Sequence, residues 1–178
     1  MLPGGVMRLC LEGARGRCRV MEAGHVVIAG IGACVIFDVW QRIFHRMTGI
    51  PPSNWAMVGR WLLRLLSGDG LFQNDLAAQP AMPGELRAGW ILHYVVAVGY
   101  AAVFAMTVQL GWLQADAVDG LVFGIASVAV PWFFFMPALG AGVMARNTPN
   151  PPVACATALM MHALFGLSLG LGFAVLSG

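Results

Sequence analysis

The sequence TPNPPVACATALMMHALFGLSLGLG, residues 148–172, joins a polar turn, a proline pair and an apolar run that contains one histidine, His162. The apolar run continues past this stretch and exceeds the roughly 18 residues that cross a hydrocarbon core about 30 Å thick. Proline is favourable in the first turn of a helix, because its missing N–H would have no partner there. The stretch therefore predicts a membrane-spanning helix over residues 152–176.

An earlier stretch, residues 79–103, has the same plan and reads QPAMPGELRAGWILHYVVAVGYAAV. In both stretches the second proline of a Pro-x-x-Pro precedes a histidine by ten residues: Pro83 precedes His93, and Pro152 precedes His162. Ten residues are about 15 Å of helix, which predicts both imidazoles near the bilayer midplane. If the repeat is a duplication, the chain forms two parallel helical hairpins related by an axis along the membrane normal.

The composition excludes a soluble globular protein. Of the 178 residues, 59% are hydrophobic and only 10% are charged, and the mean hydropathy is +0.77. The net charge of +2 comes from arginines, most of which flank apolar runs as headgroup anchors do, so binding to nucleic acid is not indicated. The four cysteines lack metal-type spacing and do not form a disulfide framework.

The predicted fold class is all-α, an integral membrane four-helix bundle, since only helices or closed barrels satisfy backbone polar groups in lipid. Residues 1–22 are predicted to be a disordered leader or, because Met21 directly precedes the first span, an over-extended reading of the start. Residues 23–178 are predicted to be a single transmembrane domain. Pro131 and Pro137 are expected to bend the third span. The four predicted spans cover residues 25–44, 83–113, 120–145 and 152–176.

A shorter amphipathic helix is predicted over residues 54–66, in the connection between the first two spans. Its tryptophans and arginines fall on different faces, which is typical of a helix lying in the membrane interface. The alternative is a helix packed over the end of the bundle, which would bury the same apolar face. The expected interfacial anchors are Trp55, Arg60, Trp61 and Arg64.

The arginines also predict the orientation of the chain. With the leader set aside, they lie only in the first and third connections and their flanks, at Arg42, Arg46, Arg60, Arg64, Arg87 and Arg146. Arginine-rich connections stay in the cytoplasm, so these two are predicted to be cytoplasmic in a bacterial inner membrane. The expected partners are the lipid bilayer and other copies or subunits of a membrane complex.

Three ionisable residues fall inside the predicted spans and form the candidate polar site: Asp38, His93 and His162. Such groups face a partner or a wet cavity, because exposing them to lipid is costly. Three roles are open for the histidines. They make packing hydrogen bonds, or they relay protons or contact a substrate, or they ligate one metal or haem together. Asp38 either pairs with Arg42 four residues on, or turns inward to orient a histidine.

No motif for nucleophilic, phosphate or zinc-protease chemistry is present, so no catalytic residue is assigned and a non-enzymatic protein is favoured. The best functional prediction is a membrane protein that handles a small solute or an ion. One alternative is an accessory or assembly subunit of a larger membrane complex. The other is a redox protein with a histidine-ligated haem or metal, although no cofactor is expected from the sequence.

Several short motifs are distributed along the predicted spans and connections. They are Asp38, Gly49-Ile50-Pro51, Asn54, Val58-Gly59-Arg60-Trp61, Gly84-Glu85, Gly89-Trp90, His93-Tyr94, Pro137-Ala138-Leu139-Gly140-Ala141-Gly142, Thr148-Pro149-Asn150-Pro151, His162 and Phe165-Gly166. Together they resemble a family of bacterial inner-membrane proteins that is grouped as a domain of unknown function. The family pattern also has a histidine after the Gly-x-Phe of the long connection, where this chain has Gln73 and Asn74. The resemblance implies a small polytopic membrane protein and supplies no activity.

Overall fold

The structure is a computed structural model that describes residues 22–177, so the predicted leader lies outside the described residues except for Glu22. In the described part the chain is helical, and four stretches are long and apolar enough to cross a membrane. This confirms the predicted class of an all-α, four-span membrane protein. The four are α1 (Ala23–Thr48), α3 (Glu85–Gln109), the stretch Ala117–Ala138, and α6 (Pro151–Ser177).

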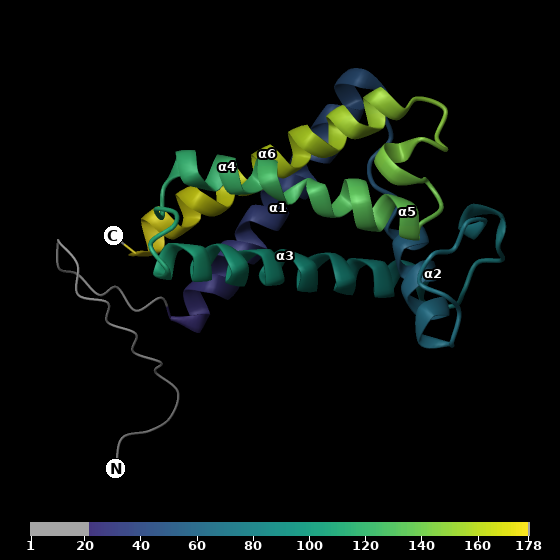
Figure 1. The fold of residues 1–178 in the computed structure, drawn as a ribbon, viewed down its shortest axis with the longest axis horizontal. Helices are drawn as coiled ribbons and strands as arrows, with labels where there is room; N and C mark the ends of the chain where they lie inside the picture. Colours follow the sequence, from purple (N-terminus) through teal and green to yellow (C-terminus); the bar gives the residue numbers. More distant parts are fainter. Residues whose placement is uncertain (1–21, 178) are drawn as a thin grey trace, which may run out of the picture.

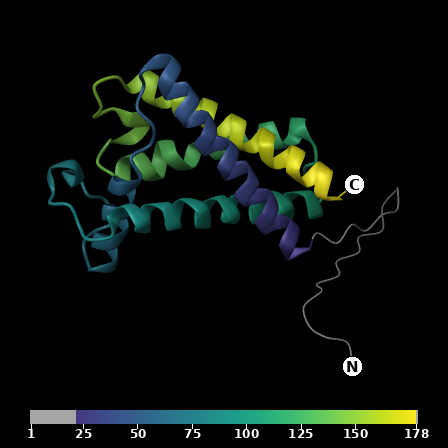
Figure 2. The same ribbon diagram turned by 180° about the vertical axis from the view of Figure 1, so that it is seen from behind.

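The spans run alternately in opposite directions, as Figure 1 shows. The first span, α1, lies across both α3 and α6, and seen from behind it runs diagonally over them (Figure 2). Phe104 of α3 and Phe173 and Leu169 of α6 are fully buried where the helices meet. The outer face of α1 carries exposed apolar side chains such as Ile28 and Ile36, which suit contact with lipid.

Glycines of α4 (Ala117–Ser127) and α6 bring these two helices into close contact. A Cβ added at Gly124 would collide with the His162 carbonyl oxygen, and one added at Gly166 would collide with the Gly120 carbonyl oxygen. Small residues allow two backbones in lipid to approach closely and gain van der Waals contact. The glycines of α4 and α6 therefore form a helix contact face.

The third span ends earlier than predicted. After α4, the chain forms a π-helical turn at Pro131–Phe135 and a short α5 (Met136–Ala138), where the Met136 N–H donates to the Pro131 carbonyl oxygen. The chain thus departs from α-geometry at the prolines, and the bend expected there stays a prediction. However, a continuous helix to residue 145 is wrong, because Gly140 and Gly142 have φ angles of 85° and 75°, in the left-handed region that ends a helix.

The amphipathic segment forms α2 (Trp55–Leu66), which begins where predicted: the Asn54 side chain accepts a hydrogen bond of 3.0 Å from the Met57 N–H. This helix crosses the first half of α3 closely, since a Cβ at Gly59 would meet the backbone of Glu85 and Gly89. The contact places α2 over the end of the bundle beside α3. Its depth relative to lipid headgroups stays a prediction.

Candidate functional site

A compact polar cluster joins α1 to α3 inside the spans. Cys34 and Asp38 are four residues apart on α1, so their side chains lie on one helix face, and that face packs against α3. The His93 Nε2 atom lies 3.0 Å from Asp38 Oδ1 and 3.1 Å from Cys34 Sγ. Cys34 and Asp38 are 1% and 7% exposed, so the three groups meet away from bulk solvent.

Tyr94 completes the surroundings of Asp38. Its hydroxyl donates a 3.0 Å hydrogen bond to Asp38 Oδ2, so both carboxylate oxygens are engaged by α3. The predicted ion pair between Asp38 and Arg42 is wrong for the described chain, since the only ion pair there that includes Asp38 is with His93. Two directed bonds from α3 hold the carboxylate inside the bundle, whereas Arg42 is exposed. The alternative, in which Asp38 turns inward to a histidine, matches the observed contact.

The contacts of His93 Nε2 have a simple chemical consequence. A ring nitrogen carries at most one hydrogen, directed along one line in the ring plane. It can donate that hydrogen to Asp38 Oδ1 or share a hydrogen with Cys34 Sγ, but one well-aligned bond leaves the other contact poorly satisfied. Three groups that ligate metals therefore converge on one ring nitrogen, whose single in-plane position serves only one of the two contacts well.

Aromatic rings enclose the imidazole on its remaining sides. The Trp55 ring, from the start of α2, stacks on His93 with a centroid distance of 3.8 Å and an interplanar angle of 26°. Trp90 and Phe37 approach the same ring at 5.8 and 5.5 Å. The structure thus places Trp55, predicted as an interfacial anchor, as a wall of the polar cluster.

One side of the cluster adjoins a hollow at the end of the bundle where the connection between α1 and α3 lies, which is named the loop end. The hollow has a volume of about 270 Å³, and its lining includes Asp38, Trp55 and Trp90. Two hydrogen bonds hold its rim, in which Gln41 donates to the Ser53 hydroxyl at 3.1 Å and accepts from the Ser53 N–H at 2.9 Å. Asp38 therefore lies beside this hollow, and its partner His93 is eight residues, about 12 Å of helix, from the start of α3.

His162 belongs to a different cluster, between α4 and α6. Its Nδ1 atom lies 2.8 Å from the Ser127 hydroxyl, which also donates 2.7 Å to the Gly124 carbonyl oxygen. Its ring packs edge-to-face with the Tyr100 ring, with 5.9 Å between the ring centroids. Tyr100 is seven residues beyond His93 on α3, about 10 Å further along the helix, so the structure does not bring the two histidines into one site.

The other predicted anchors make contacts within the protein. The Arg60 guanidinium binds both carboxylate oxygens of Glu85, at 2.8 and 3.0 Å, and these hydrogen bonds raise the pKa of Arg60 above its ordinary value. Trp61 is buried, and its indole N–H donates 2.8 Å to the Leu71 carbonyl oxygen. Arg64 pairs with Asp69 at 3.2 Å. These side chains attach α2 and the long connection to α3.

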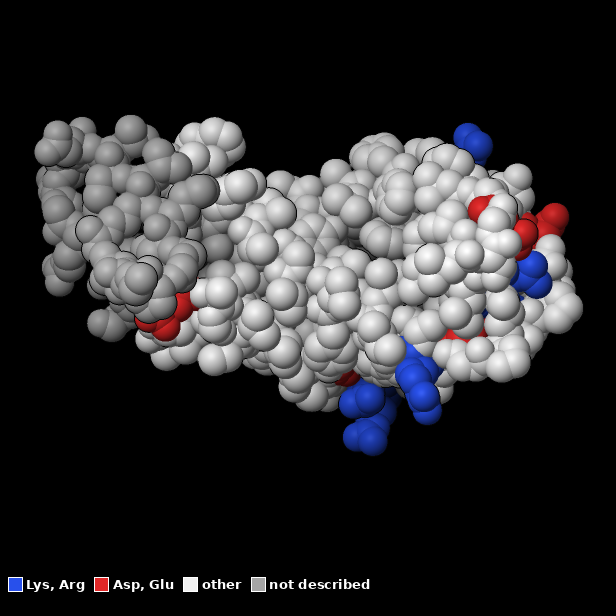
Figure 3. Space-filling view, turned by 90° about the horizontal axis from the view of Figure 1, so that it is seen from below, with Lys and Arg blue, Asp and Glu red and all other residues white. Residues whose placement is uncertain are grey.

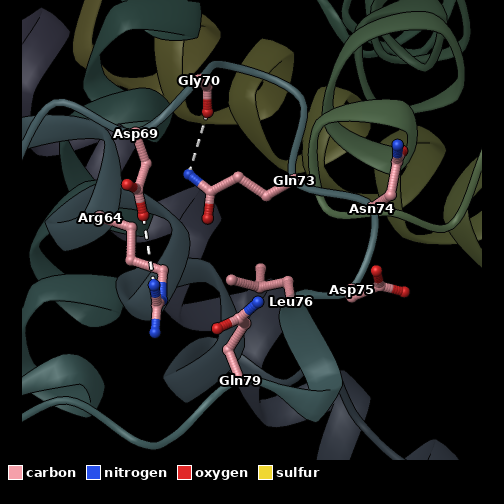
Figure 4. A pocket seen from close by; sticks show the side chains of 8 residues that line it. All are labelled: Arg64, Asp69, Gly70, Gln73, Asn74, Asp75, Leu76 and Gln79. Atoms are coloured by element: carbon pink, nitrogen blue, oxygen red, sulfur yellow. Dashed lines mark hydrogen bonds and ion pairs between the residues drawn. The ribbon is translucent and has the colours of Figure 1, made fainter.

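A second hollow lies in that long connection, as Figure 4 shows. It has a volume of about 340 Å³, and polar side chains that include Arg64, Asp69 and Gln73 line it. The Gln73 amide donates to the Gly70 carbonyl oxygen at 3.2 Å, and the Arg64–Asp69 pair spans another side of it. Because Gln73 binds back to its own loop, the contacts here stabilise the connection and gather no set of ligands.

Sequence reasoning missed two members of the α1–α3 cluster, Cys34 and Tyr94. A signal for Cys34 was present, because a cysteine four residues before a buried aspartate shares its helix face. Short metal-type spacing does not detect Cys34, since His93 lies 59 residues away on another helix. Tyr94 follows His93 directly, and only the crossing angle of α1 and α3 brings both side chains to one carboxylate.

The sequence model of one protein family matches residues 27–176, and that family is described as a protein of unknown function (DUF2938). The match covers most of the chain, so the chain belongs to this family, which confirms the resemblance noted from its motifs. No curated protein matches the chain, and no solved structure does. The activity must therefore be argued from the site itself.

Proposed function

We propose that this member of the DUF2938 family handles a small cation, which it holds at the cluster of Cys34, Asp38 and His93. The observation that carries the proposal is the convergence of Asp38 Oδ1 and Cys34 Sγ on His93 Nε2, at 3.0 and 3.1 Å, within membrane-spanning helices. Ionisable groups in spans are costly and mark ion or proton pathways. Cys34, Asp38 and His93 are such groups, and they lie together at this cluster.

Access to the cluster supports a role in handling a cation over one in packing alone. The hollow of about 270 Å³ is lined by Asp38 together with Arg42, so an ion that enters it from the loop end reaches the carboxylate past one guanidinium. Packing needs no such recess, as His162 illustrates: its Nδ1 atom contacts only the Ser127 hydroxyl among the described side chains. The route further into the bilayer would pass along α1 and α3.

We place the protein in a bacterial inner membrane with the hollow facing the cytoplasm. The six arginines of the described chain belong to the connections and flanks at the loop end of the bundle. Figure 3 shows that those visible on one face lie in its right-hand half. The turn between α3 and α4 carries Asp116, the first turn of α4 carries Asp119, and neither contains an arginine. This asymmetry favours a cytoplasmic loop end.

A resident haem is not part of the proposal. A cofactor ligated by both histidines would need His93 and His162 at one place, and Tyr100, which contacts His162, lies two turns of α3 beyond His93. The lipid bilayer is the partner that the exposed apolar faces of the spans fit. Assembly into an oligomer or a larger complex remains part of the proposal, and the same purified material tests it by its size in mild detergent.

The test is transport by the full chain reconstituted into vesicles. Protons, sodium and zinc are offered in turn, and their entry is followed by a dye trapped inside. We expect movement of at least one cation above the rate of protein-free vesicles, and loss of that movement in Asp38→Asn. The matched control is Asp75→Asn, because Asp75 is an exposed carboxylate of the long connection.

Two outcomes would refute cation handling at this cluster. One is a wild-type protein that moves none of the three cations, although circular dichroism shows it helical after reconstitution. The other is an Asp38→Asn protein whose rate equals the wild-type rate. Stable co-purification with another membrane protein, combined with either outcome, would favour the accessory-subunit alternative.

A further inference from the structure

We infer that the cation is a divalent transition metal of the zinc type, ligated by Cys34 Sγ, Asp38 Oδ1 and His93 Nε2. This inference rests on the proposed function and names the class of ion that the cluster would take. Each residue offers one ligand atom, and the three atoms all lie within 4.8 Å of one another. They come from two helices, so the helix crossing itself assembles the site.

The spacing suits a tetrahedral metal. Zinc bonds of about 2.0–2.3 Å to nitrogen, oxygen and sulfur place neighbouring ligand atoms about 3.3–3.7 Å apart. The observed separations from His93 Nε2 are 3.0 Å to Asp38 Oδ1 and 3.1 Å to Cys34 Sγ. These separations would have to widen by a few tenths of an ångström for a metal to bind all three atoms, and the metal would then satisfy both contacts of Nε2.

The ligand types decide between classes of cation. A thiolate and an imidazole suit zinc and its neighbours, whereas calcium, magnesium and sodium prefer oxygen ligands alone. Charge points the same way, because a thiolate and a carboxylate together carry −2 and a divalent ion cancels them. A neutral complex is the form that a buried site in a membrane tolerates at least cost.

Tyr94 and the hollow supply what a metal site of this kind needs beyond its ligands. Tyr94 donates its hydrogen bond to Asp38 Oδ2 and so orients the oxygen that would bind the metal. The fourth position, on the side where Asp38 lines the hollow, would be open to water or an exchanging ligand. Three protein ligands with one open position make a site that both receives and releases an ion.

Metal binding at this cluster has a defined proton balance. The thiolate is the ligand, so the Cys34 thiol gives up its proton as the sulfur–metal bond forms. His93 binds through an unprotonated Nε2: a neutral ring with its hydrogen on Nε2 shifts that hydrogen to Nδ1 and stays neutral, whereas an imidazolium releases one proton. These protons exit to the hollow, and no oxidation or reduction occurs.

A cobalt titration tests the inference in the full chain. The variant Cys10→Ser, Cys18→Ser, Cys155→Ser retains Cys34 as its single thiol, so any cobalt–thiolate charge-transfer band reports that residue. We expect this band, with tetrahedral visible absorption, at one cobalt per chain, and its disappearance when zinc is added. Equilibrium dialysis followed by elemental analysis measures the zinc affinity.

Further substitutions in the single-thiol variant show how much each contact contributes to metal binding. Cys34→Ser abolishes the thiolate band and weakens zinc binding more than any change outside the ligand set. Tyr94→Phe keeps the band and weakens binding about tenfold to a hundredfold, as changes to outer-shell partners of metal ligands do. His162→Asn retains a partner for Ser127 and leaves both the band and the affinity unchanged.

The inference is overturned if the single-thiol protein, helical and monodisperse in detergent, binds no cobalt or zinc, or binds them without a thiolate band. The two proposals fail separately. Proton or sodium movement that depends on Asp38, with no metal binding, removes the metal and keeps cation handling. Stoichiometric zinc with no transport of any cation keeps the metal site and removes the proposed function.

Discussion

The α1–α3 pair places a carboxylate, a thiol and a phenol around His93, whereas the α4–α6 pair places one serine hydroxyl beside His162. The helix contacts differ in the same way. Glycines bring α4 and α6 into backbone contact. Between α1 and α3 buried alanines and a cysteine pack, such as Ala33 and Cys34.

The difference indicates that close backbone contact and clustered polar side chains have separate roles in this molecule. Between α4 and α6 the helices are too close for a cluster of side chains, so the interface stabilises the bundle. Between α1 and α3 the helices leave room for Asp38 and Tyr94 to meet, and the hollow beside Asp38 connects them to the loop end. We therefore expect changes between α4 and α6 to affect folding, and changes between α1 and α3 to affect ion binding.

The largest effect is expected from Gly124→Ala. The added Cβ would collide with the His162 carbonyl oxygen, which is backbone and cannot rotate away. Overpacking of this kind costs roughly 3 kcal/mol. The free energy of unfolding in mixed micelles measures the loss. Gly99→Ala is the control, because a Cβ at Gly99 meets nothing within 4 Å, and a stability equal in both variants would contradict the glycine contact.

The second effect is expected from Asp38→Asn. His93 and Tyr94 lose a charged acceptor in a buried place, and hydrogen bonds to charged groups contribute about 1.5–3 kcal/mol. Unfolding is measured without added metal, with Asp75→Asn expected within about 0.5 kcal/mol of wild type. If Asp38→Asn were more stable than wild type, the carboxylate would be destabilising the fold. Its role would then be ion binding and not stability.

A smaller effect is expected from Ser127→Ala. It removes one neutral partner of His162, whose hydrogen bond contributes about 1 kcal/mol. Neither ion movement nor zinc affinity should change. A loss of transport in this variant, with its stability near that of wild type, would mean that His162 also lies on the ion route and that the two regions share a function.

The smallest effect expected is the coupling between the two regions. Asp38 and Ser127 have no hydrogen-bond partner in common in the described chain. The double variant Asp38→Asn, Ser127→Ala should therefore lose the sum of the two single losses within about 0.5 kcal/mol. A larger deviation in a double-mutant cycle would reveal a path between the clusters through the shared helices α3 and α6.

Much of the fold followed from local patterns. The long apolar runs predicted four spans, and the amphipathic spacing of residues 54–66 predicted α2, because hydrophobic length and periodicity act along a single helix. The third span was predicted too long, since Gly140 and Gly142 end it through left-handed backbone angles that apolar composition does not record. The site was predicted in part: Asp38 and His93 were named, but the sequence separated them from Cys34 and joined them to His162.

The sequence by itself determined that this chain crosses a membrane with four helices, that its arginines gather at one end, and that few ionisable residues lie inside. Transfer into lipid depends on composition summed along a helix, which is read directly from the chain. Only the tertiary structure decided the partners of those residues. Two histidines at the same distance from a proline differ because the crossing of α1 over α3 turns Cys34 and Asp38 toward one ring, while the glycines between α4 and α6 leave space for a single hydroxyl.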